Sequence, residues 1–179
     1  MRKRLIIISD LWGWEKSDWL IYYTQGLEKK FDITLYDSCQ IGKVDTSDYA
    51  QDYLHKQFVH SGIDLAVDHL VEKEKHPVNI LAFSVGGVIA WKYGLRTGNL
   101  LSLYCISSTR LRKEVKKPKG EIKLFFGAND PYKPPLKWLE GRKLKATIIP
   151  NKGHEVYREA EFANNLSDFI LSAHVTHSC

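Results

Sequence analysis

The sequence predicts an α/β protein: a three-layer α/β/α sandwich whose sheet is mostly or wholly parallel and has about six strands. Short apolar runs rich in β-branched and aromatic residues alternate along the chain with segments whose apolar residues recur at helical spacing. This alternation is typical of a parallel sheet in which the crossover connections are helices. The chain has 179 residues, of which 44% are hydrophobic and 26% charged. We therefore expect one globular domain over residues 1–179.

The six expected strands are apolar runs that stop abruptly at polar residues, glycine or proline. The first covers residues 5–9, and its continuous apolar sequence suits a strand buried on both faces. The basic residues before it resemble the start of a signal peptide, but the apolar run is too short and no cleavage site follows. The other five strands are expected at Phe31–Tyr36, Val78–Phe83, Leu100–Ile106, residues 122–126 and Ala146–Ile149.

Helical periodicity and capping residues place the helices between these strands. Ser17 or Asp18 is a suitable cap for a helix that contains Leu20 and Leu27. Residues 38–62 show no sustained period, so we expect a long loop with some helix there. Further helices are expected from residue 63 to near Pro77, after Ser84, from Pro134 through Trp138, and over residues 155–173.

A tight corner is expected where the strand Val78–Phe83 ends, because a helical pattern begins at once. Ser84 would lie at the apex of this corner, and the small residues Ala82 and Gly86 leave room for it. The backbone of the serine would be strained and its hydroxyl would face outwards. The alternative is an ordinary strand–helix turn in which Ser84 only caps the helix.

Two further polar residues follow the last two expected strands, in turns that contain glycine. They are Asp130 and His154. Because the carboxyl ends of parallel strands lie at the same edge of a sheet, we expect both at the edge where Ser84 lies. A serine hydroxyl needs an adjacent base to act as a nucleophile at neutral pH, and a histidine oriented by a carboxylate is such a base. Taken separately, Asp130 could form a turn and His154 could be a surface residue.

These motifs resemble those of the α/β-hydrolases. Ser84 and Gly86 fit the family pattern G-x-S-x-G, with Ala82 in place of the first glycine, and the order Ser, Asp, His along the chain is the family's. The resemblance implies a serine hydrolase with the α/β-hydrolase fold. In such an enzyme, Ser84 would be the nucleophile, His154 would be the general base, and Asp130 would orient the imidazole of His154.

The resemblance also implies an oxyanion hole built from two backbone N–H groups. One belongs to the residue after the nucleophile, here Val85. The other comes from the loop after the first strand, where relatives often have His-Gly and this chain has Ser9-Asp10. Leu11 is therefore the expected second donor, with Trp12 as the alternative.

Compared with many members of the family, the scaffold would lack the N-terminal antiparallel strands and a lid domain, which leaves a nearly open site. Trp12 and Trp14 could line an acyl pocket or pack in an ordinary hydrophobic cluster. The implied reaction is hydrolysis of a small carboxylic ester or thioester through an acyl-serine intermediate, without a cofactor or a metal. Two alternatives stay open: an acyl thioesterase that acts on a carrier-bound acyl group, and a non-catalytic binding protein that keeps the fold.

Charge and cysteine content bear on partners and location. The net charge is +5, and much of the excess lies in the basic segment from Arg110 to Lys119. Such a segment is usually a solvated loop, but it could attract an anionic partner. No recognition motif for nucleic acid accompanies it, and no apolar run is long enough to span a membrane. Cys39, Cys105 and Cys179 are too widely spaced for a disulfide framework or a metal site, which favours a cytoplasmic location.

Overall fold

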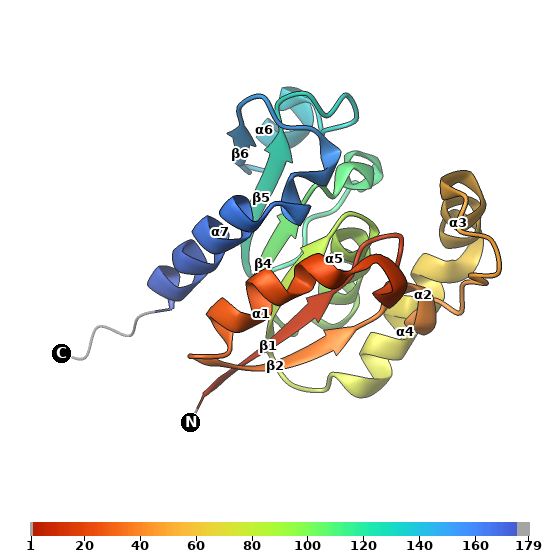
Figure 1. Ribbon diagram of the computed structural model, residues 1–179, viewed down its shortest axis with the longest axis horizontal. Helices are drawn as coiled ribbons and strands as arrows, with labels where there is room; N and C mark the ends of the chain where they lie inside the picture. The colour runs from red at the N-terminus through yellow and green to blue at the C-terminus, as the bar shows by residue number, and fades with distance from the viewer. Residues whose placement is uncertain (1, 175–179) are drawn as a thin grey trace.

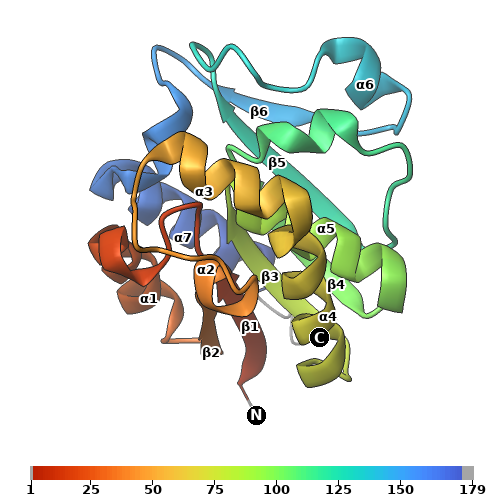
Figure 2. The same cartoon turned by 90° about the vertical axis from the view of Figure 1, so that its right-hand side faces the viewer.

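The computed structural model describes residues 2–174 and shows a six-stranded sheet between two layers of helices (Figure 1 and Figure 2). All neighbouring strands pair in parallel. The expected α/β sandwich is therefore confirmed, and its sheet is wholly parallel. The strands are β1 (Lys3–Ile8), β2 (Phe31–Tyr36), β3 (Val78–Phe83), β4 (Leu100–Ile106), β5 (Glu121–Gly127) and β6 (Ala146–Ile149), in the spatial order β2-β1-β3-β4-β5-β6.

The direction of strand addition reverses once, between β1 and β3. From β1 the chain crosses to the edge strand β2, returns to place β3 on the other side of β1, and then continues outwards to β6. Ligands of open parallel sheets bind beyond the carboxyl ends of the strands at such a reversal. Because Ile8 pairs with Ala82, β1 and β3 end side by side. The loops that follow these two strands therefore share one part of the carboxyl edge.

Helices cover both faces of the sheet. On one face, α1 (Ile21–Leu27) packs against α7 (Ala160–Ala173), and on the other, α4 (Ile63–Lys73) packs against α5 (Val85–Thr97) (Figure 2). The remaining helical segments are short: η1 (Trp14–Lys16), η2 (Asp18–Leu20), α2 (Ser38–Ile41), α3 (Gln51–Gln57), η3 (Phe58–Gly62), η4 (Thr109–Lys113), α6 (Leu136–Glu140) and η5 (His154–Arg158).

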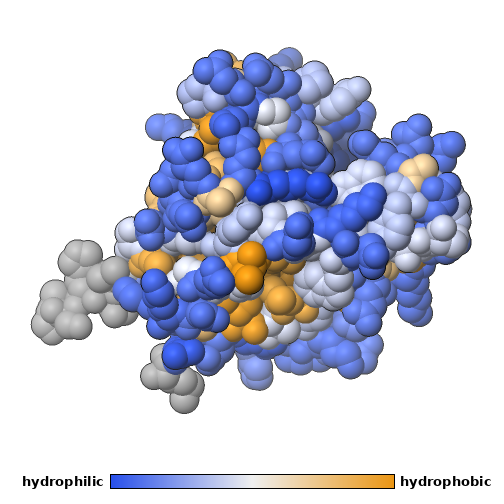
Figure 3. All heavy atoms as spheres, viewed as in Figure 1, coloured by the Kyte–Doolittle hydropathy of each residue, from blue (hydrophilic) through white to orange (hydrophobic). Residues whose placement is uncertain are grey.

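The central strands contribute to two hydrophobic cores, because successive side chains of a strand point to opposite faces. In β1, Ile6 and Ile8 belong to the core under α4 and α5, whereas Leu5 and Ile7 belong to the core under α1 and α7. Every residue of β3 is buried, as is typical of a strand covered on both sides. Figure 3 shows the outer face of the α1–α7 layer, where apolar side chains gather over α1.

Two helical regions differ from the sequence expectation. The helix expected from Ser17 or Asp18 begins with 3₁₀ turns, and α-helical structure starts only at Ile21. The Ser17 hydroxyl donates to the carbonyl of Gly13 instead of capping a helix. The helix expected over residues 155–173 is interrupted at Glu159, whose extended backbone (φ −83°, ψ 128°) separates η5 from α7.

Within residues 2–174, no helix combines the length and the apolar character needed to cross a membrane. Cys39 and Cys105 are buried free thiols, and Cys179 lies outside the described residues. The connection between β4 and β5, where a lid domain could be inserted, consists of η4 and a loop that leads back to the amino end of β5.

Candidate active site

Ser84 lies at the corner between β3 and α5, in a backbone conformation that non-glycine residues rarely adopt. Its φ is 49° and its ψ is −117°, so the expected strained corner is confirmed. The Ser84 N–H donates to the carbonyl of Ile106 (2.8 Å) and the Gly87 N–H donates to the Ser84 carbonyl (3.1 Å). These bonds hold the strained residue, and its side chain stays partly accessible to solvent.

Gly86 permits the first turn of α5 to lie directly against the end of β1. A Cβ atom at this position would lie 2.5 Å from the carbonyl oxygen of Ser9 and 2.8 Å from that of Ile8. Both distances are too short for a carbon atom, so the close approach of the two backbones requires glycine. This contact places the loop after β1 beside the N-terminal turn of α5.

The loops that carry Asp130 and His154 are bonded to each other along their backbones. The Ala128 N–H donates to the Ile149 carbonyl (2.9 Å), and the Asn129 N–H donates to the Lys152 carbonyl (2.9 Å). A Cβ atom on Gly127 would lie 2.3 Å from that same Lys152 oxygen. The pairing of β5 with β6 thus continues beyond the sheet and fixes the separation of the two polar side chains.

The side chains of Ser84, His154 and Asp130 form one hydrogen-bonded series. Asp130 Oδ2 lies 2.7 Å from His154 Nδ1, and His154 Nε2 lies 3.0 Å from Ser84 Oγ. An ionised carboxylate only accepts hydrogen bonds, so Nδ1 carries the proton and donates to Asp130. In that tautomer Nε2 is an acceptor, and the Ser84 hydroxyl donates to it.

The environment of Asp130 keeps its carboxyl group ionised. The side chain is 1% exposed, and this burial raises its pKa. The hydrogen bonds from His154 and from the Tyr132 N–H (3.0 Å), together with the nearby Lys133 ammonium, outweigh burial and bring the pKa below the ordinary value of 3.8. The partner imidazole of His154 is 37% exposed, so the series runs from a buried carboxylate to a hydroxyl that solvent can reach.

Ser107, directly after β4, fixes the backbone of His154 and was not among the residues expected from the sequence. Its hydroxyl donates to the carbonyl of His154 (2.5 Å), and its own N–H donates to the carbonyl of Phe125 (2.9 Å). Its φ of 53° is a second left-handed backbone conformation at this edge. The strand-end rule that selected Asp130 also applies to Ser107, so the sequence did hold a signal for it.

Two of the backbone N–H groups expected in the oxyanion hole have no acceptor within residues 2–174. They belong to Leu11, in the loop after β1, and to Val85, the first residue of α5, whose N–H has no partner inside the helix. The N–H of Trp12, in contrast, donates to Asp10 Oδ1 (3.0 Å). Of the two N–H groups expected from this loop, that of Trp12 is therefore already bonded and that of Leu11 is not.

Asp10, which stands where relatives often have part of a His-Gly pair, connects this loop to η5. Its carboxylate is fully buried; besides the Trp12 N–H it accepts hydrogen bonds from the Tyr157 hydroxyl (2.9 Å) and from Arg158 Nη2 (3.4 Å). Burial raises the pKa of Asp10, and these three donors oppose that rise. The Tyr157 ring also contacts the imidazole of His154 edge to face, with centroids 6.2 Å apart. Tyr157 and Arg158 thus anchor η5 to the loop after β1.

The two tryptophans expected near an acyl pocket differ in their surroundings. Trp12 is half-buried and packs against the core under α4 and α5, while the Lys16 ammonium lies 4.7 Å from its ring centroid and 5.1 Å from that of Tyr49. Trp14 is exposed, and its N–H donates to Asp37 Oδ2 (2.9 Å). The Trp12 contacts tie the loop after β1 to the segment that precedes α3.

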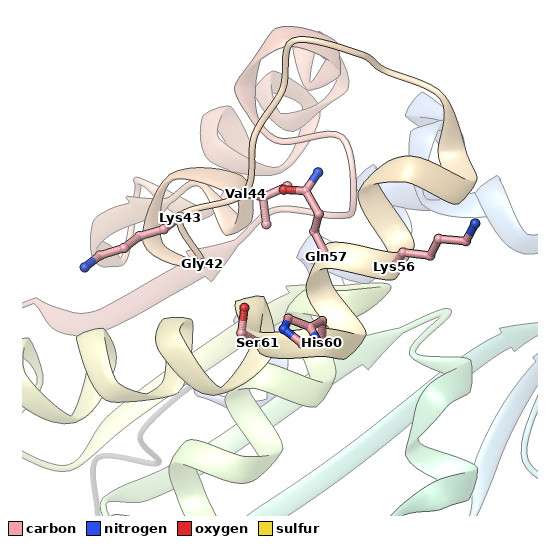
Figure 4. Close-up of a pocket in the computed structure, with 7 residues that line it drawn as sticks. All are labelled: Gly42, Lys43, Val44, Lys56, Gln57, His60 and Ser61. Atoms are coloured by element: carbon pink, nitrogen blue, oxygen red, sulfur yellow. The ribbon is translucent and has the colours of Figure 1, made fainter.

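A cavity of about 520 Å³ lies between α2 and the α3–η3 region, and it contains none of the residues of the series (Figure 4). The side chains of Lys43 and Lys56, which belong to its lining, point in opposite directions in Figure 4. The amide of Gln57, also in the lining, bonds the backbone of Asp45 at both ends. These polar groups do not converge on a common point, so the cavity is a less suitable candidate than the carboxyl edge.

No family model matches the sequence, and no curated protein matches it significantly. Solved structures do match. A protein from Xanthomonas campestris pv. campestris assigned to the α/β hydrolase superfamily has a TM-score of 0.68 and 16% identity, over 96% of this chain and 99% of that one. An α/β serine hydrolase without a lid from Xanthomonas campestris has a TM-score of 0.62 and 12% identity, over 100% and 86% of the two chains.

Carboxylesterase CesB from Bacillus subtilis is similar as well, with a TM-score of 0.63 and 13% identity, over 97% of this chain and 85% of that one. These structures share the whole architecture with the chain at low identity. The chain therefore has the α/β-hydrolase fold, as the motifs implied.

Proposed function

We propose that the protein is a serine hydrolase that cleaves a small carboxylic ester through an acyl-serine intermediate, with Ser84, His154 and Asp130 as its catalytic residues. The observation that carries the proposal is the hydrogen-bonded series of these three side chains, which ends at a hydroxyl on a strained, solvent-accessible corner. The fold is shared with a carboxylesterase and with a lidless serine hydrolase, which supports the same class of reaction.

In the first half of the proposed reaction, Ser84 Oγ attacks the carbonyl carbon of the ester while its proton passes to His154 Nε2. Asp130 keeps the imidazole in the required tautomer and stabilises its protonated form. The oxyanion that forms on the carbonyl oxygen accepts hydrogen bonds from the N–H groups of Leu11 and Val85. Donors of this kind, already oriented before the reaction, typically contribute 10²–10³-fold each to the rate.

In the second half, His154 returns the proton to the departing alcohol, and the acyl group stays on Ser84. A water molecule then attacks the acyl carbon and gives its proton to His154, which passes it back to Ser84 as the carboxylic acid leaves. The half-exposed imidazole and the short connection between β4 and β5 suit a site that solvent and small substrates reach directly. Trp12 and Trp14, in the loop beside Leu11, are proposed to contact the acyl group.

The proposal is tested with p-nitrophenyl esters and acyl thioesters of graded acyl length, assayed with the wild type and the Ser84→Ala variant. We expect turnover of short esters by the wild type and its loss in the variant, with unchanged thermal unfolding. Higher kcat/KM for the thioester than for the ester of equal length would identify a thioesterase instead. The proposal would be wrong if the Ser84→Ala variant kept its turnover. It would also be wrong if the folded wild type turned over neither the esters nor the thioesters.

A further inference from the structure

Positive charge is concentrated in one part of the fold. Residues 110–152, about a quarter of the chain, contain 13 of the 26 lysines and arginines but only four of the 21 acidic residues. They form η4, β5, α6 and β6, the upper part of the molecule in Figure 1. Among the four acidic residues, Asp130 is buried and Glu121 lies 3.1 Å from Lys123. Lys123 and Lys152 are the cations of this segment that form ion pairs, with Glu121 and Glu159. The segment still has a clear excess of positive charge, 13 cations against four acidic residues.

Exposed apolar side chains are set among these cations. The three most exposed large apolar side chains in residues 2–174 are Val115 (81%), Leu136 (69%) and Tyr132 (64%). The guanidinium of Arg112 lies over the Tyr132 ring, 5.5 Å from its centroid. We call the surface of Arg112, Lys113, Val115, Lys116, Tyr132, Leu136 and Lys137 the basic flank.

Two buried tryptophans hold the backbone of the basic flank. Trp91 Nε1 donates to the carbonyl of Lys116 (3.0 Å), and Trp138 Nε1 donates to that of Glu114 (2.9 Å). Arg142 donates to the same Glu114 oxygen and stacks on the Trp138 ring, 4.4 Å from its centroid. The loop after η4 is thereby fixed in position, and a partner would meet a surface that is already ordered.

The basic flank begins at the candidate active site. The backbone N–H of Tyr132 donates to Asp130 Oδ1, so its exposed ring lies two residues from the buried carboxylate of the series. We propose that the basic flank docks an acidic protein that carries an acyl group on a flexible arm and presents it to Ser84. Hydrolysis of the presented acyl group rests on the proposed serine nucleophile, with a carrier-bound thioester in place of a free ester as the substrate, whereas the docking itself does not rest on it.

Charge complementarity selects an acidic partner, and the arrangement of the apolar side chains selects a protein over a membrane surface. Helices that lie in a membrane interface present a continuous apolar face, but here the exposed apolar residues are single residues with cations beside them in the sequence, as in Lys113, Val115 and Lys116. The helix in this surface, α6 (Leu136–Glu140), has five residues and cannot form such a face. Tyrosine and arginine, which are paired here as Tyr132 and Arg112, are enriched in protein–protein interfaces.

The test measures binding of an acyl carrier protein loaded with a decanoyl thioester to the Ser84→Ala variant, so that hydrolysis plays no part. On this background, we compare the triple variant Lys113→Glu, Lys116→Glu and Lys137→Glu with a control triple variant, Lys29→Glu, Lys30→Glu and Lys56→Glu. All six lysines are exposed, and both triple variants change the net charge equally. We expect the flank variant to raise Kd roughly tenfold or more, the control to leave it within about twofold, and NaCl to weaken binding.

The docking proposal would be wrong if the two triple variants changed Kd equally. It would also be wrong if the parent, the Ser84→Ala variant, did not bind the carrier protein. The docking proposal would also be wrong if the Ser84→Ala protein bound vesicles of phosphatidylcholine and phosphatidylglycerol but not the carrier protein, and if the flank variant lost the binding to vesicles. In the Ser84 enzyme, the flank variant should keep the parent's rate on a p-nitrophenyl ester. If the wild type bound the carrier protein but did not hydrolyse the ester, the proposed function would be wrong and the docking proposal would remain.

Discussion

Two buried carboxylates, those of Glu74 and Asp130, lie at opposite ends of β3. One is paired with an arginine and the other with a histidine. Glu74, just before the strand, accepts hydrogen bonds from Arg4 (2.7 Å) and from the Tyr36 hydroxyl (2.5 Å), while its backbone carbonyl accepts one from Tyr93 (3.0 Å). Asp130 lies at the edge where β3 ends, and its side-chain partner is His154. Both carboxylates are 0–1% exposed.

The difference lies in what the partner can do with a proton. Arginine stays protonated in proteins, so Arg4 does not exchange a proton with Glu74, and their ion pair serves to hold the fold together. An imidazole gains and loses a proton near neutral pH, and the second nitrogen of His154 faces the hydroxyl of Ser84. A buried carboxylate therefore marks a candidate active site only when its partner connects it to a reactive group that solvent can reach.

Replacement of Ser84 should have the largest effect on activity. We expect Ser84→Ala and Ser84→Gly to lower kcat on a p-nitrophenyl ester by roughly 10⁶-fold, because no other hydroxyl replaces the nucleophile. The two variants should differ in stability: glycine adopts a φ of 49° without strain, so Ser84→Gly should be more stable than Ser84→Ala by about 1 kcal/mol. Steady-state kinetics and chemical unfolding measure the two effects; an alanine variant as stable as the glycine variant would contradict the strained corner.

Replacement of Asp130 by Asn should have the next largest effect, a drop of about 10⁴-fold in kcat. The amide can donate to His154 Nδ1 and so favours the wrong tautomer of the imidazole. Kinetics on the same ester measure this change, with circular dichroism to confirm the fold. A drop of only a few-fold would mean that another group orients His154.

The same variant should reveal a pH-dependent contribution to stability. The folded-state pKa of Asp130 is lowered below 3.8, so the ionised carboxylate stabilises the folded protein at every pH above that value. This stabilisation is lost as pH falls through the lowered folded-state pKa. The difference in unfolding free energy between wild type and Asp130→Asn should be constant near neutral pH and shrink below about pH 4. If the difference in unfolding free energy grew as the pH fell, it would contradict a lowered pKa of Asp130 in the folded protein.

Removal of the Asp10 carboxylate should have an intermediate effect on catalysis. Asp10→Ala leaves the Trp12 N–H and the Tyr157 hydroxyl without their acceptor, and the loop that carries the Leu11 donor loses its link to η5. We expect kcat to fall by about 10–100-fold, as is typical when a supporting contact of an active site is lost. Asp10→Asn keeps an acceptor oxygen for Trp12 and should retain more activity. Equal kcat in the alanine variant and the wild type would show that this link has no role in the reaction.

Replacement of Glu74 should leave catalysis unchanged and lower stability. Glu74→Ala removes the acceptor of Arg4 and Tyr36, and hydrogen bonds to charged groups typically contribute about 1.5–3 kcal/mol each. Because Arg4 is 43% exposed and can be rehydrated, we expect a total loss of about 3 kcal/mol in chemical unfolding. The exposed Glu72, which lies 3.6 Å from Lys73, provides a control, and Glu72→Ala should change stability by less than about 1 kcal/mol. A change in kcat for Glu74→Ala would remove the contrast between the two ends of β3.

The strands were predictable because apolar runs and the polar residues that stop them are local features. Four of the six strands have the expected bounds, and Ser84, Asp130 and His154 followed from the same strand ends. The interruption at Glu159 was not predictable, because η5 is anchored by a contact that joins Tyr157 to Asp10, 147 residues away in the sequence. Helical periodicity continues through such a break. Ser107 was overlooked although it follows β4, because serine after a strand is common and only its bond to the His154 carbonyl reveals its role.

The nucleophilic character of Ser84 is tested most directly by covalent labelling with a fluorophosphonate, followed by intact-protein and peptide mass spectrometry. We expect a single adduct on Ser84 in the wild type, no adduct in Ser84→Ala, and much slower labelling in Asp130→Asn. Folded wild-type protein that gains no adduct, or an adduct on another residue that persists in Ser84→Ala, would contradict the proposed role of Ser84.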